Sequence, residues 1–141
     1  MRAKRLKQSK SLMGGGDPVA VIELGTTSIR MVIAEITRGG KFRVLDTLQQ
    51  VVSLGRDTFT DGQIARSTVE ACVAALRSFQ KVMREYGIVE DRHVRAIATS
   101  AVREAENRDA LVDRIQIATG IQVAIIDEAE ISRLTYLAVR P

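Results

Sequence analysis

A short polar turn near the start of the chain has the composition of a phosphate-binding loop. Its members are one glycine and three small hydroxyl residues: Gly25, Thr26, Thr27 and Ser28. A glycine lets the backbone approach a phosphate closely, and successive N–H groups and hydroxyls donate hydrogen bonds to its oxygens. Apolar runs at 19–24 and 29–36 flank the turn and predict a hairpin. An ordinary hairpin with a polar turn explains the same residues, because all of these types are common in turns.

A second polar cluster follows the apolar run at 93–98, where a predicted strand gives way to a helix. Thr99 and Ser100 supply two hydroxyls at the helix start, and Arg103 adds a guanidinium one turn later. Helix-start N–H groups, hydroxyls and an arginine can converge on one anion, and arginine can hold two phosphate oxygens at once. Asn107 is expected to cap the next helix rather than to bind a ligand.

Three stretches in this order carry a resemblance to a known family. The first reads VIELGTTSIR, the second ATSAVREAEN, and the third DEAEISRL, which begins at Asp127. Together they resemble the N-terminal part of the exopolyphosphatase and guanosine pentaphosphate phosphohydrolase family, within the actin-like and sugar-kinase-like ATPase superfamily. The resemblance covers about residues 19–140. It implies removal of terminal phosphate from polyphosphate or a guanosine tetra- or pentaphosphate, with Mg²⁺ as the metal.

The resemblance assigns roles to individual residues. Glu23 takes the position of an aspartate that helps to hold a metal ion or orient water, and a solvated carboxylate at a strand end is the alternative. Thr26, Thr27 and Ser28 take the positions of Ser-Asn-Ser, so the hydroxyl donors are kept and the asparagine amide is replaced. Arg30 matches an arginine of the family and lies, by strand alternation, on the same side as Ser28. An exposed strand arginine explains it equally well.

The third stretch departs from the family pattern. Aligning Arg133 and Leu134 with its Arg-Leu places Glu130 on the first of two paired glutamates and Ile131 on the second, the expected general base. Isoleucine cannot accept a proton. Glu130 is therefore the remaining candidate for the catalytic base, although adjacent helical residues point about 100° apart. With Asp127 it also matches a capping box, and this structural role is favoured.

The apolar pattern also predicts the elements that position these residues. Three strands, at 19–24, 29–36 and 42–53, form a β-meander. Then follow a helix with a capping box at 60–63 that ends at Gly87, a strand at 93–98, a short helix from about Ser100, a helix at 107–119, a strand at 122–126 and a helix from about 128. The order β-β-β-α-β-α-β-α predicts an α/β fold of the ribonuclease-H-like (actin-like ATPase) type, with a mixed five-stranded sheet and helices packed on it.

The net charge of +4 comes from the N-terminus. Five of the 21 basic residues lie in the first ten positions: Arg2, Lys4, Arg5, Lys7 and Lys10. Residues 19–141 carry sixteen basic and sixteen acidic side chains. Residues 1–18 are therefore expected to form a flexible basic arm, and 19–141 one domain, the first half of a two-domain phosphatase. The arm could contact nucleic acid, anionic lipid or polyphosphate, and a merely solvated arm is the favoured alternative.

Composition excludes several function classes. The lone Cys72 and the lone His93 exclude an internal disulfide, a histidine-based metal site and a Ser-His triad. Cys72 lies in the apolar stripe of a predicted helix and is expected to be a core residue. No apolar run approaches the ~20 residues that cross a bilayer, and the basic start lacks the apolar segment of a secretory signal. The chain is therefore expected to be cytoplasmic, without membrane insertion.

Hypotheses of two classes remain. The first is a phosphohydrolase; the second is a catalytically impaired phosphate-binding or regulatory protein that keeps the cradle but lacks the base at Ile131. An actin-like ATPase or sugar kinase fits less well, because the Thr-Ser-Ala-x-Arg stretch is not part of those patterns. In the family a second, glycine-rich phosphate loop follows shortly after the position of Pro141, so the chain is expected to be a piece of a longer protein or an isolated half-site. Its expected partners are polyphosphate or a guanosine polyphosphate and the rest of the phosphatase or a second subunit, a homodimer included.

Overall fold

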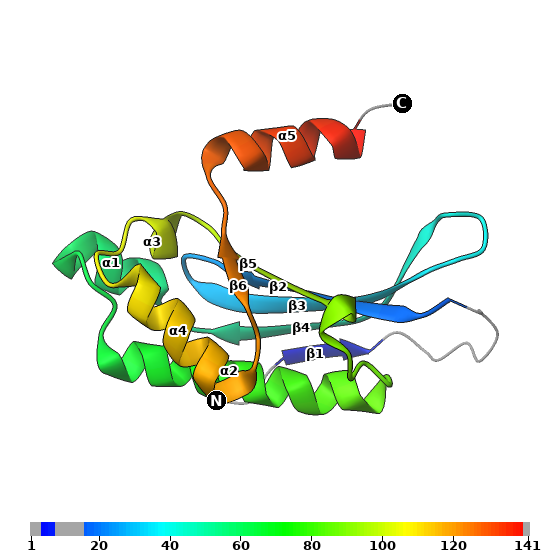
Figure 1. Cartoon of the computed structure of the whole chain (residues 1–141), viewed down its shortest axis with the longest axis horizontal. Helices are drawn as coiled ribbons and strands as arrows, with labels where there is room; N and C mark the ends of the chain where they lie inside the picture. The colour runs from blue at the N-terminus through cyan, green and yellow to red at the C-terminus, as the bar shows by residue number, and fades with distance from the viewer. Residues whose placement is uncertain (1–3, 8–15, 140–141) are drawn as a thin grey trace.

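The computed structural model describes residues 4–7 and 16–139 of the chain. In chain order its elements are β1 (Lys4–Lys7), β2 (Pro18–Leu24), β3 (Ser28–Ile36), β4 (Phe42–Val51), α1 (Leu54–Asp61), α2 (Arg66–Glu85), the 3₁₀ turn η1 (Asp91–His93), β5 (Val94–Ala98), α3 (Ser100–Arg103), α4 (Arg108–Thr119), β6 (Val123–Ile125) and α5 (Glu128–Val139). Figure 1 shows these elements arranged in layers around a sheet.

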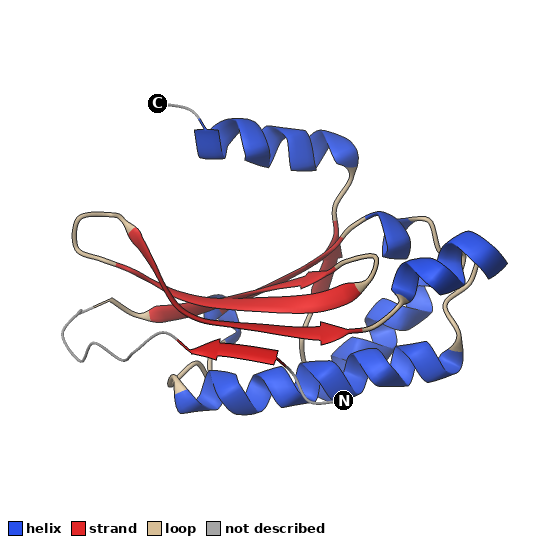
Figure 2. Cartoon of the chain, turned by 180° about the vertical axis from the view of Figure 1, so that it is seen from behind, coloured by secondary structure: helices blue, strands red, loops and turns tan. Residues whose placement is uncertain are grey.

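The sheet is mixed, and its strand order in the described residues is β1-β4-β3-β2-β5-β6 (Figure 2). The strands β2, β3 and β4 form an antiparallel meander, whereas β5 and β6 run parallel to β2. The five expected strands are all present, each with its ends within two residues of the expected bounds. The ribonuclease-H-like prediction is therefore confirmed.

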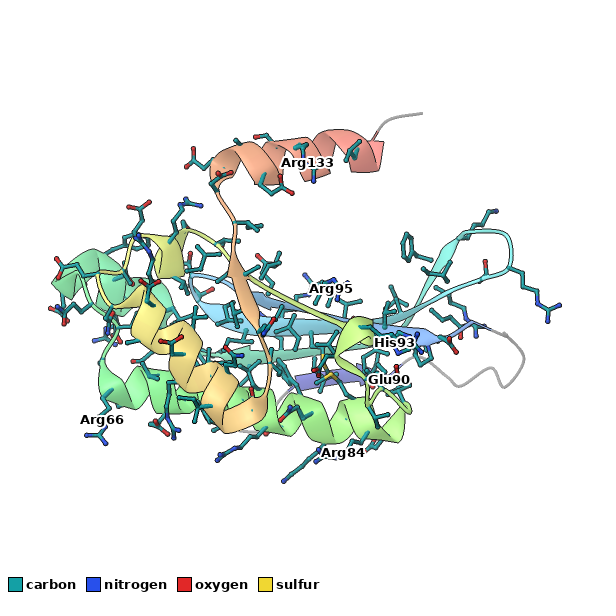
Figure 3. All side chains as sticks on the ribbon, in the orientation of Figure 1. Arg66, Arg84, Glu90, His93, Arg95 and Arg133 are labelled. Carbon is teal, nitrogen blue, oxygen red and sulfur yellow. The ribbon has the colours of Figure 1, made fainter. Side chains whose placement is uncertain are left out.

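One face of the sheet is covered by α2 and α4. In β2, Ala20, Ile22 and Leu24 are buried toward these helices, while Val21 and Glu23 are exposed on the other face. This period-2 burial is what a strand with one covered face requires. Arg95 of β5, labelled in Figure 3, is in register with Val21 and projects from the same open face.

The longest helix, α2, supplies much of the opposing core. It buries a stripe that includes Cys72, Leu76 and Phe79. Burial raises the pKa of the Cys72 thiol to about 12, so the thiol stays protonated at neutral pH and is a poor nucleophile. The expected core role of Cys72 is confirmed.

The last helix, α5, lies on the opposite side of the sheet from α2 and α4 and stands away from it in both views (Figures 1 and 2). Among the described residues, an ion pair from Arg103 of the preceding short helix α3 to Glu128 joins α5 to another helix. No helix of the described part is long and apolar enough to span a membrane.

The helix α1 was not expected from the sequence. Its eight residues end at Asp61. Gly62 follows as the C-cap; its φ of +74° suits a glycine, and its N–H donates to the Thr58 carbonyl at 2.8 Å. The predicted capping box at 60–63 is therefore wrong, because Thr60 and Asp61 close α1 instead of opening the next helix. The following helix, α2, begins at Arg66.

The sheet also has a sixth strand from the segment expected to be a flexible arm. Lys4–Lys7 pairs antiparallel with the outer edge of β4, with Lys4 opposite Gln49. An uncovered edge presents unpaired N–H and C=O groups, and backbone pairing there needs no apolar alternation. A basic segment can therefore complete the edge, and side-chain pattern does not reveal it. Arg2 and Lys10, which were also assigned to the basic arm, lie outside the described residues.

Candidate functional site

Three strand ends meet at one edge of the sheet. The carboxyl end of β2 lies beside that of β5, where the Thr99 N–H donates to the Leu24 carbonyl at 3.4 Å. The Ile126 N–H donates to the Ala98 carbonyl at 3.0 Å and brings the end of β6 alongside. The turn at 25–28 and the helix start at Ser100 therefore lie side by side, as expected for parallel strands of one sheet.

The turn at 25–28 leaves two backbone donors unused. It closes through a hydrogen bond of 3.0 Å from the Gly25 N–H to the Ser28 carbonyl. Thr26 and Thr27 are exposed, and no acceptor among the described residues takes their N–H groups. A glycine with positive φ is not required here, but a Cβ on Gly25 would lie 3.2 Å from the Ser28 oxygen. Two adjacent free N–H groups at an exposed turn can bind an anion.

The segment between β4 and α1 holds this turn in place. The N–H groups of Val52 and Gly55 donate to the carbonyls of Thr27 and Thr26, at 3.2 and 2.8 Å. Both carbonyls are therefore directed toward the protein. The sequence analysis did not predict this support; the available signal was Gly55, two residues after the predicted strand at 42–53.

The residues beyond the turn lie on the open face of the sheet. Glu23 and Arg30 are opposite each other in register, and Arg30 is in turn opposite Gln49 of β4. The Gln49 side chain donates to the Ser28 hydroxyl at 3.0 Å. Ser28 and Arg30 are on the same side, as predicted, and Gln49 joins them as a polar neighbour that the sequence did not reveal.

A metal ion would have few ligands from the described residues. These contain no group of three or more His, Cys, Asp or Glu side chains that could hold one. Glu23 is a single exposed carboxylate beside the turn. Magnesium is usually held by one or two carboxylates together with substrate phosphates and water. The chemistry of this residue therefore fits a metal that binds together with a phosphate, and not one held by these side chains alone.

The second cluster surrounds the start of α3. Thr99 and Ser100 are half-buried, and no described residue accepts the N–H groups of Ser100 and Ala101. The two hydroxyls and these donors lie next to the turn at 25–28, because Thr99 is bonded to Leu24. The arrangement can contribute further donors to the same anion.

Arg103, expected to bind phosphate, makes several polar contacts within the protein. Its Nη1 donates to the Ile126 carbonyl at 2.9 Å, and ion pairs of 3.5 and 3.8 Å join it to Glu104 and Glu128. The side chain is 21% exposed. Arg103 therefore fastens the segment that leads from β6 into α5. A guanidinium has five donors, so this leaves capacity for a phosphate.

Asn107 is structural, but not in the way the sequence predicted. It occupies the N-cap position of α4 and makes no side-chain capping hydrogen bond. Instead its Nδ2 donates to the Ile64 carbonyl, and its Oδ1 accepts from the Ile64 N–H, both at 2.9 Å. The prediction of a capping side chain is wrong, because this partner from a distant part of the chain uses both functions of the amide.

The third cluster is a helix cap. Asp127 Oδ1 accepts from the Glu130 N–H at 2.7 Å, which confirms the expected cap at the start of α5. The Glu130 carboxylate accepts from Arg133 Nε and Nη2 at 2.9 and 2.7 Å, and this hydrogen bonding lowers the pKa of Glu130. Arg133 lies on α5, away from the sheet (Figure 3). The Ile131 side chain is outside the described part of the structure.

The chain also matches a family of known proteins. Residues 32–141 match the Ppx/GppA phosphatase family. The chain belongs to this family. The match includes the clusters at Thr99 and at Asp127 and begins just after the turn at 25–28.

Individual Ppx/GppA relatives cover a longer stretch. The chain is 29% identical over 122 residues to exopolyphosphatase 1 of Mycobacterium leprae, which spans 86% of this chain and 35% of that protein. A crystal structure of the Aquifex aeolicus Ppx/GppA family member superposes with a TM-score of 0.78 at 30% identity, over 86% of this chain and 39% of that one. For an exopolyphosphatase from Cytophaga hutchinsonii the TM-score is 0.75 at 31% identity, over 83% and 36% of the two chains.

The chain thus spans little more than a third of the length of these relatives. The matched part is the ribonuclease-H-like domain described above. Whatever the remaining parts of the relatives contribute to activity must be tested for this protein separately.

Proposed function

We propose that this chain supplies the N-terminal phosphate-binding half of a phosphohydrolase that removes terminal phosphate from inorganic polyphosphate or guanosine pentaphosphate. The observation that carries the proposal is the meeting of the turn at 25–28 with the start of α3, both with unused backbone donors. Membership of the Ppx/GppA family and the similarity to exopolyphosphatases support the reaction class.

In this proposal the terminal phosphate binds against the N–H groups of Thr26 and Thr27. Ser28, Thr99 and Ser100 add hydroxyl donors, and Gly25 keeps the backbone accessible. Arg30 and Arg103 offset the negative charge that phosphoanhydride cleavage must stabilise. Arg30 is the less constrained of the two, because within the described residues it has no ion-pair partner.

Magnesium is the proposed cofactor, with Glu23 as its ligand from this chain. When bound, the ion would neutralise phosphate charge and bring ordered water. Glu23 would orient this ion, directly or through water, toward the phosphate held by the turn. Its position opposite Arg30 puts one carboxylate and one guanidinium at the same place on the open face.

A second candidate function is phosphate binding without catalysis. The ion pair that engages the Glu130 carboxylate favours it. The carboxylate is paired with Arg133, and the lowered pKa makes it a weaker base. The position that the family resemblance gives to the base is Ile131. On this alternative the cradle at 25–28 binds polyphosphate as a regulatory ligand.

The test is calorimetric titration of the chain with inorganic tripolyphosphate, with and without Mg²⁺. We expect Arg30→Gln to weaken binding roughly tenfold, since a hydrogen bond to a charged group is lost. Arg38→Gln is the matched control, because Arg38 is an exposed arginine between β3 and β4 at the other end of the sheet. Glu23→Gln should remove the gain in affinity that Mg²⁺ provides.

Equal effects of Arg30→Gln and Arg38→Gln would show that only general positive charge attracts the ligand. This result would refute a phosphate-binding site at the turn at 25–28. Phosphate release from guanosine pentaphosphate then separates the two functions. Turnover that Glu130→Gln abolishes identifies Glu130 as the base. Because the chain spans only part of its relatives, this comparison is made in a protein that also carries the parts matching the rest of them, and binding without turnover in that protein favours the regulatory function.

A further inference from the structure

The two edges of the sheet differ in charge. One edge is β1, whose sequence KRLK has three cations in four residues. The other edge is β6, and the stretch around it from Ile115 to Ile126, IQIATGIQVAII, contains no charged residue in a chain of which 27% is charged. Charged side chains, lysine above all, keep exposed edges from pairing with other chains. The β1 edge has this protection, and the β6 edge lacks it.

Two residues of β6 direct their backbone groups toward this free edge. In a parallel pair, alternate residues of a strand bond to the neighbouring strand, and the Ile126 N–H donates to the Ala98 carbonyl of β5 at 3.0 Å. Ala124 is in phase with Ile126, so Val123 and Ile125 turn their N–H and C=O groups the other way. Among the described residues no strand covers this edge, and no other backbone group pairs with these four. In Figure 1 β6 lies in front of the other strands. It therefore offers two donors and two acceptors to a further strand.

The spacing of these groups suits a second copy of β6. When two copies run antiparallel with Ala124 opposite Ala124, Val123 of each copy lies opposite Ile125 of the other. Each of these two pairs exchanges two N–H···O bonds, which uses every free group of both strands. The two alanines form the narrow pair between them, with Cα atoms about 4.5 Å apart and no hydrogen bond. Alanine is small enough for this position, and the three residues of β6 are enough for the four bonds.

A cavity beside β6 suits an apolar side chain of that second copy. Its volume is about 750 Å³, and its lining includes the apolar side chains of Met83, Ile88, Ile121 and Val123. Val123 is 8% exposed on the helix-covered side of the sheet, whereas Ala124 is exposed on the open face. Ile125 of the second copy, opposite Val123, then lies on the helix-covered side beside this lining. Burial of its side chain adds an apolar contribution to the four hydrogen bonds.

We propose that β6 pairs antiparallel with β6 of a second copy of the chain, so that two sheets join into one across a two-fold axis at Ala124. A second copy fits this edge because identical strands repel each other when charges lie opposite one another, and neither strand carries a charge here. Because the strands run antiparallel, the turns at 25–28 of the two copies face opposite directions. Pairing does not require a phosphate at either turn.

The experiment measures self-association of the chain by sedimentation equilibrium at physiological ionic strength. Ala124→Lys and Ala124→Glu each place like charges opposite each other at the axis and should weaken the dimer more than about tenfold. An equimolar mixture of the two variants should restore association, because lysine then lies opposite glutamate.

Gln122→Lys and Gln122→Glu are the matched controls. Gln122 is exposed, and in this register it lies about 13 Å along the strand from Gln122 of the second copy. Charges at this separation are largely screened, so each control should change the dimer dissociation constant by less than about threefold. The mixture of the two controls should behave like its components.

Cross-linking checks the register. Ala124→Cys should form a disulfide between copies on mild oxidation, because the expected Cα spacing of about 4.5 Å lies in the range that disulfides span. Gln122→Cys should not form one. The native Cys72 is fully buried and does not compete.

Loss of association in both charge variants at Ala124, with recovery in their mixture, supports the proposal. A dimer that persists in both variants, or that Gln122→Cys links as readily as Ala124→Cys, uses another surface or register and overturns it. Loss without recovery and without a disulfide in Ala124→Cys overturns it as well. An unaltered chain that stays monomeric also overturns it and leaves the β6 edge for an extended segment of a different protein.

Discussion

Asn107 joins two segments that are 43 positions apart in sequence. Its amide uses one donor and one acceptor on the backbone of Ile64, in the short connection between α1 and α2. The same pair of groups on Ile64 would otherwise need water or another partner, since half-buried backbone polar groups are costly to leave unpaired. This bridge holds α1, and with it the support of the phosphate turn, against the start of α4.

The bridge and a helix cap predict different outcomes for Asn107→Asp. A cap tolerates the change, because asparagine and aspartate are equally good at this position. The bridge does not, because the carboxylate cannot donate to the Ile64 carbonyl and places an acceptor against it. We expect Asn107→Asp to lower the free energy of unfolding by about 1–3 kcal/mol in urea denaturation at neutral pH.

The matched control is Asp127→Asn, at the residue that does cap a helix with its side chain. This exchange should change the free energy of unfolding by less than about 0.5 kcal/mol. An Asn107→Asp variant as stable as the unaltered chain would show that the two hydrogen bonds to Ile64 contribute nothing.

The residues that sequence reasoning described well are those whose partners are close in the chain. Asp127 and Glu130 are three positions apart, and their cap follows from local spacing. Asn107 and Arg103 bond to Ile64 and Ile126, 43 and 23 positions away, and no local pattern reports such a partner. The sequence shows that an amide can hydrogen-bond to backbone groups and that a guanidinium can donate to oxygen atoms. It does not show which distant residues are their partners.

At the scale of elements, α1 is the support on which the candidate site depends. It packs on the turn at 25–28 through Gly55 and on α3 through Thr58. A Cβ on Gly55 would fall on the Thr26 methyl and lie 3.2 Å from the Thr26 carbonyl. We expect Gly55→Ala to cost about 1–3 kcal/mol of unfolding free energy, despite the better helix propensity of alanine, because two packed segments must separate. Thermal and urea denaturation measure the loss.

Two further variants identify the cause of that loss. Gly39→Ala is the control, because a Cβ there meets nothing within 4 Å, and it should be close to neutral. Thr26→Ser removes the obstructing methyl group and keeps the hydroxyl, so it should restore part of the stability in the Gly55→Ala background and not in the unaltered chain. Additive effects of the two changes would contradict the contact.

The strands and long helices could be predicted because their apolar spacing matches their burial. In β2 every second residue is buried, and α2 buries one stripe. The helix α1 was not predicted because it buries the polar Thr58 and exposes the apolar Phe59. Prediction from apolar periodicity assumes the opposite burial. The strand β1 escaped because an edge strand is held by backbone pairing. Both exceptions come from polar contacts that replace apolar burial.

At the scale of the whole molecule, α5 differs from the other long helices in what surrounds it. The helices α4 and α5 both have twelve residues, but α4 packs on α2, whereas α5 stands away from the sheet. Isolated helices of this length are marginal in water, and most helix stability in proteins comes from packing. The exposed side of the sheet, with Val21 and Val51 among its exposed residues, is likewise uncovered by α2 and α4.

Native-state hydrogen exchange should therefore separate these two helices. We expect amides in the middle of α5 to exchange more than about 100-fold faster than those in the middle of α4, because α5 opens locally while α4 opens only with the core. Protection of α5 equal to that of α4 would contradict the arrangement and would mean that the helix packs on a surface in solution. Repeating the measurement at tenfold lower protein concentration then decides which surface it is: protection lost on dilution identifies a second copy of the chain, and protection that persists identifies the open face of the same sheet.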